Sequence, residues 1–454
     1  MSKIRLHGSS SGYTEIAPVA ASGNNTLTLP DDGTILSKDA AGAVGVTSVH
    51  TTNITATGIA TITTAKIGAG VTITESGIEA SGIGITCASI NGGQIGGPRN
   101  LVVNGSMIVA QRGTSSTSSG YYTVDRMRHY HNGTDEAPTY AQSDVSSGTS
   151  PYTEGFRKAF KFTNGNQTSG AGVSDAMELQ YRVEAQDLAT CGWNYTSSSS
   201  FITLSFWVKS SVAQNFYGHL TTEDGTQQNY PFETGSLTAD TWTKVVRTIP
   251  GNSNLQFDND VNQGLQMKWV TFRGTSYTGS GSTLNQWSTY ASGSRTPDNT
   301  STWYTTNDAT LEITGIQLEV GSQATPFEHR RYSDELTRCL RYYYKSKNDS
   351  GVSGEHWWGN CTQHAATQAR GCIVFPTPMR TVPSAFETTG TASDYKVWYK
   401  NNATTTCSSV PTCDAMSSRS ARLTFTVSSG LTAGEGASYR SGSTDAYIAW
   451  SAEL

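Results

Sequence analysis

The sequence has few charged and few apolar residues for its length. Of its 454 residues, 15% are charged and 35% are hydrophobic, and much of the remainder is Gly, Ser, Thr and Asn. These residues favour turns and polar strand faces, so long helices are nearly excluded. No run approaches the roughly 18 apolar residues of a membrane span, and the N-terminus MSKIRLHG lacks the apolar core of a signal peptide. We therefore expect a soluble, cytosolically made chain of two to four modules, without membrane insertion.

A basic surface is also missing. The net charge of −5 argues against nucleic-acid binding, which requires clustered Lys and Arg. The seven cysteines are odd in number and scattered, which favours reduced thiols buried as small hydrophobic residues. A zinc site at Cys361, Cys372, Cys407 and Cys413 stays open as an alternative, although ten and five intervening residues separate the two pairs. We expect no metal and no cofactor.

Residues 315–344 carry the most informative pattern. Apolar and polar residues alternate over 316–320, and apolar residues then recur at helical spacing over 336–344. Ser333 is the predicted N-cap of this helix, because acidic residues follow it in the first turn. The segment predicts a strand and then a short helix that joins two β-rich modules.

Residues 99–330 consist of short, strictly alternating strands separated by polar turns. The clearest strands are 177–184, 202–209 and 265–269. Alternation of this kind predicts an antiparallel β-sandwich or jelly roll, with one buried and one solvated face for each strand. The alternation shifts at Thr314 and Gly315, which predicts a β-bulge. Four carboxylates alternate with core positions and are expected on solvated faces: Glu178, Glu184, Glu312 and Glu319.

Several motifs resemble tail fibre proteins of tailed bacteriophages, in particular phages of marine bacteria and cyanobacteria. LEVG, TPFE and RYY occur in that order within 318–343, and RNLVVNGSMIVAQRGTS opens the sandwich at 99–115. IVFPTPMRTVPSAF at 373–386 and the closing AEL resemble the tip modules of these fibres. The plan of residues 99–330 is similar to carbohydrate-binding-module jelly rolls.

The resemblance implies an all-β, elongated homotrimeric fibre with one short helix. Its expected parts are a tail-attachment segment (1–35), a Gly/Ile-rich intertwined β shaft (36–98), the jelly-roll β-sandwich (99–330), a linking helix (331–347) and a C-terminal β tip domain (348–454). The shaft segment buries too little apolar surface to fold alone, so three copies are expected to wrap around one axis. A flexible Gly-rich linker is the alternative for this segment.

Aromatic side chains are the candidate receptor-binding groups, because the apolar faces of sugar rings stack on Trp and Tyr. The candidates are Trp207, Trp287, Tyr290, Trp303, Trp357, Trp358, Trp398 and Tyr399. Trp207 lies on the polar side of its strand, and the next three lie in a Gly/Ser/Thr-rich loop over about 274–305. Packing against a neighbouring protomer is an equally open interpretation for Trp207 and these loop residues.

The predicted function is non-covalent attachment of a virion to a bacterial surface polysaccharide or an outer-membrane receptor. The partners implied are two further copies of the chain and, through the N-terminus, phage tail adaptor or nozzle proteins. The chain is expected in the virion and not to be an enzyme, because paired carboxylates such as glycosidases use are not evident. A polysaccharide depolymerase and a purely structural fibre are the alternatives.

Overall fold

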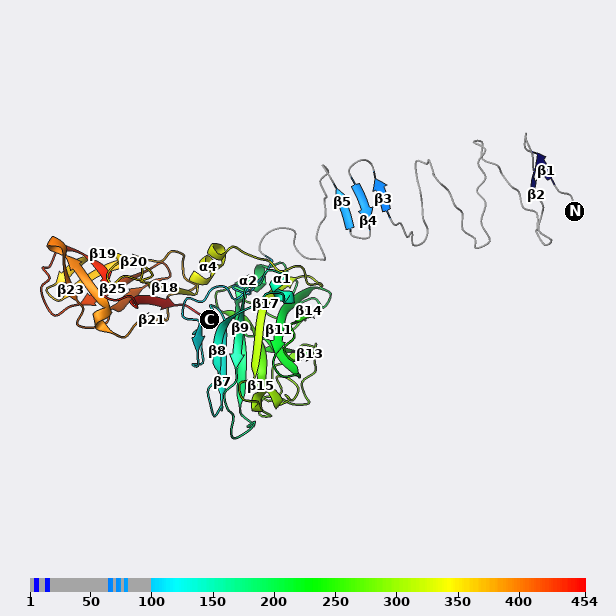
Figure 1. The fold of residues 1–454 in the computed structure, drawn as a ribbon, viewed down its shortest axis with the longest axis horizontal. Helices are drawn as coiled ribbons and strands as arrows, with labels where there is room; N and C mark the ends of the chain where they lie inside the picture. Colours follow the sequence, from blue (N-terminus) through cyan, green and yellow to red (C-terminus); the bar gives the residue numbers. More distant parts are fainter. Residues whose placement is uncertain (1–3, 8–12, 17–63, 68–70, 75–76, 81–98) are drawn as a thin grey trace. The chain divides into compact units, whose positions relative to one another are not determined.

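The computed structural model describes residues 4–7, 13–16, 64–67, 71–74, 77–80 and 99–454 (Figure 1). The chain divides into two compact units, Met1–Thr86 and Cys87–Leu454. Strands dominate, and the paired strands are antiparallel, so the all-β expectation is confirmed. Among the described residues, no helix combines the length and apolar character that a bilayer crossing requires.

The first unit contributes two small antiparallel sheets. Strand β1 (Ile4–His7) pairs with β2 (Tyr13–Ile16) in one of them. The other has the order β3 (Thr64–Ile67), β4 (Val71–Thr74), β5 (Gly77–Ala80). Most of the predicted attachment segment and shaft lies outside the described residues, and the trimeric shaft stays a prediction.

Two six-stranded sheets form the sandwich. The first sheet has the order β16 (Ser288–Thr289), β13 (Gln228–Ser236), β12 (Asn215–Thr222), β15 (Gln263–Arg273), β10 (Ala176–Glu184), β7 (Arg128–Asn132). The second sheet has the order β14 (Thr243–Pro250), β11 (Phe201–Ser210), β17 (Thr310–Val320), β9 (Lys158–Thr163), β8 (Thr139–Asp144), β6 (Ser115–Ser116). Three short helices accompany them: α1 (Ser150–Thr153), α2 (Ala185–Thr190) and α3 (Thr302–Thr305).

The core fills the space between the two sheets. Strand β10 contributes its odd-numbered apolar residues to this core: Met177, Leu179, Tyr181 and Val183. The even-numbered positions of β10 therefore point away from the core, because neighbouring side chains on a strand face opposite sides. This outward face of the first sheet carries the groove described below.

The predicted bulge lies in β17. Pairing between β11 and β17 shifts register beside Gly315, which has a φ of +64°. Before the shift β17 pairs with β9, and after it Ile316 donates a backbone hydrogen bond to the Gly105 carbonyl. The change of apolar phase in the sequence thus marks the point where the strand changes its neighbour.

The predicted solvated carboxylates are not solvated. Glu178 is 2% exposed, Glu184 1%, Glu312 7% and Glu319 2%. Each has found polar partners: Arg273, Arg341, Lys209 and Thr325 respectively. The prediction was wrong because neighbouring strands and the segments after β17 place cationic or hydroxyl partners against these carboxylates, and strand alternation alone does not predict such partners.

The linking helix α4 (Tyr332–Leu340) is shorter than the predicted 331–347. Residues 343–347 instead form β18 (Tyr343–Lys347), which pairs with β27 (Tyr447–Ser451) of the tip. The N-cap is Arg331, and Ser333 lies inside the first turn, so the predicted cap was wrong. Tyrosines that fit a helical repeat are equally good strand residues, and the tip provides the pairing partner.

The tip contains a three-stranded and a seven-stranded sheet. The smaller has the order β18, β27, β21 (Ala385–Thr388). The larger has the order β23 (Ala403–Thr406), β22 (Tyr395–Tyr399), β26 (Gly436–Ser441), β19 (Trp357–Ala365), β20 (Gln368–Val374), β25 (Ser420–Thr426), β24 (Thr412–Met416). Two 3₁₀ turns, η1 (Ala392–Asp394) and η2 (Lys400–Asn402), flank β22.

Candidate functional site

A polar groove of about 310 Å³ crosses β7, β10 and β15 on the outward face of the first sheet. Its lining residues are Arg128, Tyr130, Ala176, Glu178, Gln180, Arg182, Gln266, Lys268, Arg273, Tyr277 and Arg295. Strand residues supply the floor, and the segment after β15 supplies Tyr277 and Arg295 at one side. Five of these side chains are cationic and one is a carboxylate, in a chain whose net charge is −5.

Side-chain hydrogen bonds hold the groove floor in place. Gln180 accepts from Arg128 Nη1 at 2.6 Å and from Gln266 Nε2 at 3.0 Å, which ties together the three strands. The Gln180 amide nitrogen donates to Glu178, and Glu178 forms a buried ion pair with Arg273. These contacts fix the floor before any ligand enters, which lowers the entropic cost of binding.

The deepest part of the floor is a charged pair backed by a neutral histidine. Burial alone would raise the pKa of Glu178, but Arg273 and Lys268 outweigh it and lower that pKa. Burial, with Arg273 and Lys268, lowers the pKa of His219 well below its usual value, so this ring is neutral. Its Nε2 accepts from Arg273 Nη1 at 2.9 Å, so Nδ1 carries the proton and donates to Asn229 Oδ1 at 2.6 Å.

Lys268 places a cation in the floor without a direct partner. The residue is 9% exposed, and no hydrogen bond or ion pair joins its Nζ to another described residue. Burial lowers the pKa of Lys268 to about 8, and the attraction of Glu178 opposes this shift only in part. The ammonium group is therefore still protonated near neutral pH, in a place where it lacks a close counter-charge.

The side of the groove combines aromatic rings with a second cation. The Arg295 guanidinium lies 4.9 Å from the centre of the Tyr277 ring and 5.6 Å from that of Tyr290. Its Nε has no hydrogen-bond partner among the described residues. The two rings hold the guanidinium by cation–π attraction and leave its donor groups without an acceptor in this part of the chain.

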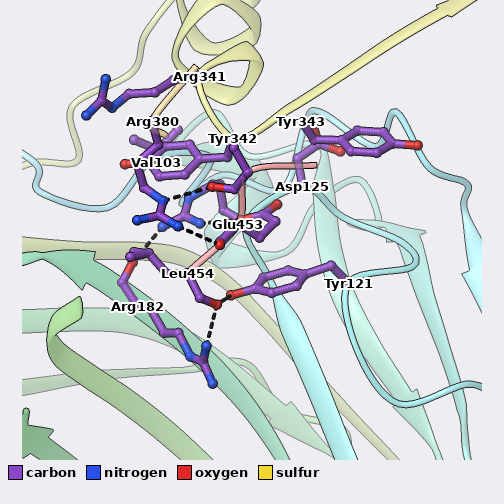
Figure 2. A network of polar contacts seen from close by, with 12 residues as sticks. Val103, Tyr121, Asp125, Arg182, Arg341, Tyr342, Tyr343, Arg380, Glu453 and Leu454 are labelled. Carbon is purple, nitrogen blue, oxygen red and sulfur yellow. Dashed lines mark hydrogen bonds and ion pairs between the residues drawn. The ribbon is translucent and has the colours of Figure 1, made fainter. Parts of the chain in front are cut away.

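The other end of the groove is supported by the last residues of the chain. Arg182 and Tyr121 both donate to the Leu454 carbonyl, as Figure 2 shows. Arg380 donates to the carbonyls of Ala452 and Glu453 at 2.8 Å each, which fixes the same segment from the tip side. The position of Arg182 in the groove thus depends on the contact between sandwich and tip.

Four of the eight aromatic candidates are buried. Trp207 is 8% exposed and Trp287 7%, Trp358 is 5% and Trp303 0%. Their indole groups donate to Glu154, Pro250, Ser346 and Thr310 respectively. Trp207 was expected on a polar, accessible face, but it is buried because Phe156 and Trp242 pack with it in one cluster. Whether any of the eight residues binds a receptor stays a prediction.

The remaining candidates are accessible at two separate places. Tyr290 is half-buried beside Arg295 at the side of the groove. In the tip, Trp357 is 45% exposed and forms an edge contact with Trp398 at 5.6 Å, and Arg440 lies 5.0 Å from the Trp357 ring. Tyr399 follows Trp398 on β22 and is also half-buried.

Sequence reasoning missed the groove floor. Its polar side chains were counted as a solvated strand face, whereas β7, β10 and β15 place them side by side. One signal was present: the polar positions of 178–182 and 266–268 carry Glu, Gln, Arg and Lys, not the Thr and Ser of an ordinary solvated strand. Within the described residues no group of three His, Cys, Asp or Glu side chains gathers for a metal, and no disulfide joins the six cysteines found there.

No family model matches the chain, and no curated protein matches it either. Solved structures with some likeness include the enzymatically active domain of bacteriophage CBA120 tailspike protein 4, with 9% identity and a TM-score of 0.25. That match covers 49% of this chain and only 21% of the tailspike chain.

Two further solved structures are similar over most of their own length. A putative sugar-binding protein from Bacteroides thetaiotaomicron has 12% identity and a TM-score of 0.26, over 49% of this chain and 99% of that one. A family 11 carbohydrate-binding module from Clostridium thermocellum has 11% identity and a TM-score of 0.21, over 47% of this chain and 98% of that one. These values are too low to support a conclusion about function.

Replacing Lys268 with methionine is expected to stabilise the protein near pH 7. The folded-state pKa of Lys268, about 8, lies below the ordinary value of 10.5, so folding disfavours its charged form. The penalty is complete below about pH 8 and disappears as pH rises toward about 10.5. We expect a gain of about 2 kcal/mol, after allowing for the lost attraction to Glu178.

Urea unfolding of both proteins at neutral pH and at about pH 10 measures this difference. The gain should shrink at the higher pH. A destabilised Lys268→Met variant at neutral pH would show that the ammonium group is well solvated in the folded protein.

Proposed function

We propose that this chain is a receptor-binding fibre protein that attaches a phage particle to a bacterial surface by holding a glycan in the groove of the first sheet. The groove itself is the observation that supports this proposal most directly. The groove is open to solvent, hydrogen bonds fix its polar floor, and Tyr130 and Tyr277 line it.

The chemistry of the groove suits a saccharide. The Gln266 amide can exchange hydrogen bonds with hydroxyls, and Tyr130 and Tyr277 line the groove, where aromatic side chains can pack against the apolar side of a sugar. The tail-fibre assignment rests on the sequence motifs at 99–115, 318–343 and 373–386. If three chains assemble, three modest sites on one particle would raise the avidity without any new contact.

We further propose binding without turnover. Glycoside hydrolysis uses two carboxyl groups on either side of the bond, about 5 to 9 Å apart. Glu178 is the sole carboxylate among the described residues that line the groove, and Arg273 and Gln180 already engage it. These features favour a binding site over a depolymerase.

The test is binding of the purified full chain to an array of bacterial surface oligosaccharides. We expect the double variant Tyr130→Ala, Gln266→Ala to lose at least about tenfold in affinity for any bound saccharide, since it removes a stacking face and two hydrogen-bonding groups. The double variant Trp357→Ala, Trp398→Ala in the tip is the matched comparison and is expected to bind normally.

If the Trp357→Ala, Trp398→Ala variant loses affinity and the Tyr130→Ala, Gln266→Ala variant binds normally, the aromatic pair of the tip is the recognition site. Release of reducing ends from a bound polysaccharide, at a steady rate, would overturn binding without turnover.

A further inference from the structure

We infer that the groove selects acidic saccharides, with Lys268 and Arg295 as the pair of side chains that binds the carboxylate or sulfate group. This inference rests on the proposed function and adds the chemical class of its ligand. A uronic acid and a sulfate ester share the feature that matters here, an anionic group carried on a sugar ring.

The groove concentrates positive charge. Five cationic side chains line it and only one carboxylate among the described residues does, although acidic residues outnumber basic ones in the chain by 36 to 31. Cations placed close together repel one another unless an anion lies between them. A groove of this composition is therefore suited to a ligand with negative charge.

Three of the five cations in the groove already have an acceptor. Arg273 pairs with Glu178, Arg128 donates to Gln180, and Arg182 donates to the Leu454 carbonyl. No side-chain hydrogen bond or ion pair joins Lys268 or Arg295 to another described residue. These two are consequently the groups with donors to offer a ligand.

Lys268 is a largely buried residue, 9% exposed, with a charged end group. A charge in such a place costs free energy when no counter-charge lies close by. Glu178 attracts the Lys268 ammonium group but is bound to Arg273. A ligand carboxylate or sulfate in the groove would supply the missing counter-charge.

Arg295 is preorganised for binding. Its guanidinium contacts the Tyr277 and Tyr290 rings, so its rotamer is restricted before a ligand enters. A planar guanidinium whose donors lack an acceptor binds the two oxygens of a carboxylate or sulfate side by side. Tyr277 also lines the groove, so a neighbouring sugar ring can pack against its side chain.

Paired probes that differ only in charge test the inference by titration calorimetry. One pair is oligogalacturonate and its methyl ester, and the other is a sulfated oligosaccharide and its desulfated form. We expect the charged member of at least one pair to bind about tenfold more tightly than its neutral partner at low salt, and the difference to shrink as salt increases. Comparing the two pairs distinguishes a carboxylate ligand from a sulfate ligand.

Three variants locate the effect. Lys268→Met and Arg295→Gln should each reduce the preference for the charged probe to less than about threefold, whereas Lys268→Arg should keep it. Lys161→Met is the matched control, because Lys161 lies on β9 of the other sheet and outside the groove. Circular dichroism and the unfolding transition of each variant verify that it is folded.

The pH dependence provides a second readout. Lys268 faces Glu178 on β10, Arg273 on its own strand, His219 on β12 and Arg295 on the loop side, and Glu223 also acts on it. The pKa of His219 lies well below this pH range, so its ring stays neutral, whereas the pKa of Lys268, about 8, lies within about pH 7 to 10. Affinity for the charged probe should fall several-fold across this range, and the Lys268→Arg variant should show no such fall.

The outcomes separate this inference from the proposed function. Equal binding of charged and neutral probes, abolished by Tyr130→Ala, would overturn the selectivity for acidic saccharides and leave glycan binding intact. Binding of single-stranded DNA of equal charge as tightly as the charged probe would overturn the saccharide selectivity. Failure of every saccharide on the array to bind would overturn the proposed function itself.

Discussion

Replacing Arg126 with methionine is expected to destabilise the unit Cys87–Leu454 by about 3 to 5 kcal/mol, because the change leaves the buried Glu453 carboxylate without its closest cation. The two side chains are 1% and 6% exposed. Arg126 also donates to the Arg182 carbonyl and lies 3.5 Å from the centre of the Tyr342 ring. Methionine keeps most of the apolar stem and removes only the charge and the hydrogen bonds.

A double-mutant cycle with Glu453→Gln isolates the pair. We expect the double variant to be more stable than Arg126→Met alone, since the Glu453 charge is then absent and Arg112 keeps its contacts with Ser451 and the Tyr343 ring. Arg112, which is 3.2 Å from Glu453, limits the loss in Arg126→Met to the lower part of the range. Thermal and urea unfolding measure the effect, and a loss under about 0.5 kcal/mol for both single variants would place this contact in solvent.

The second large effect is expected at Gly315. Substitution by alanine should cost about 3 kcal/mol or more, because the residue has a positive φ and a Cβ there would lie 2.7 Å from Phe156 Cζ. Phe156 is 1% exposed and packs against Phe327, with ring centres 4.8 Å apart, so it has little room to move.

Gly148 provides the matched control for Gly315. It also has a positive φ, +82°, but no described atom lies within 4 Å of the position that a Cβ would take there. Gly148→Ala should cost only the backbone term of about 1 kcal/mol. Unfolding midpoints of the two variants measure the difference, and equal losses would show that Phe156 yields without cost. A smaller side chain at Phe156 should rescue Gly315→Ala and leave Gly148→Ala unchanged.

The strands and the bulge were predictable because each depends on local sequence. Alternation over 177–184 and 202–209 identified β10 and β11, and the change of phase at Thr314 located the bulge of β17. The end of the linking helix was not predictable in the same way. Tyr343 fits both a helix and a strand, and its pairing with Ser451 on a distant part of the chain decides between them.

The groove required the tertiary structure. Lys268 and Gln180 are 88 positions apart in the sequence, and only the β10–β15 pairing makes them neighbours. Tyr277 and Arg295 line the same groove from the segment after β15, and the alternation of strand residues gives no information about where such a segment folds. The burial of Trp287 and Trp303 was unpredictable for a related reason. Both lie in the polar segment that was expected to be a loop, yet both rings belong to the core, and Trp303 lies in α3. Composition of a loop does not show which of its side chains are buried.

The sandwich begins and ends at one place, and this has a mechanical consequence. Glu328 accepts hydrogen bonds from the backbone amides of Arg99 and Asn100, and Arg330 donates to the Asn100 carbonyl. Leu101 donates to the Leu318 carbonyl just beyond them. A tensile force applied between the residues before Arg99 and those after Arg330 would act on these hydrogen bonds of residues 99–101 with Leu318, Glu328 and Arg330. The same pull would also reach β10 through the ion pair of Glu184 with Arg341, so one strand of the groove is coupled to the load.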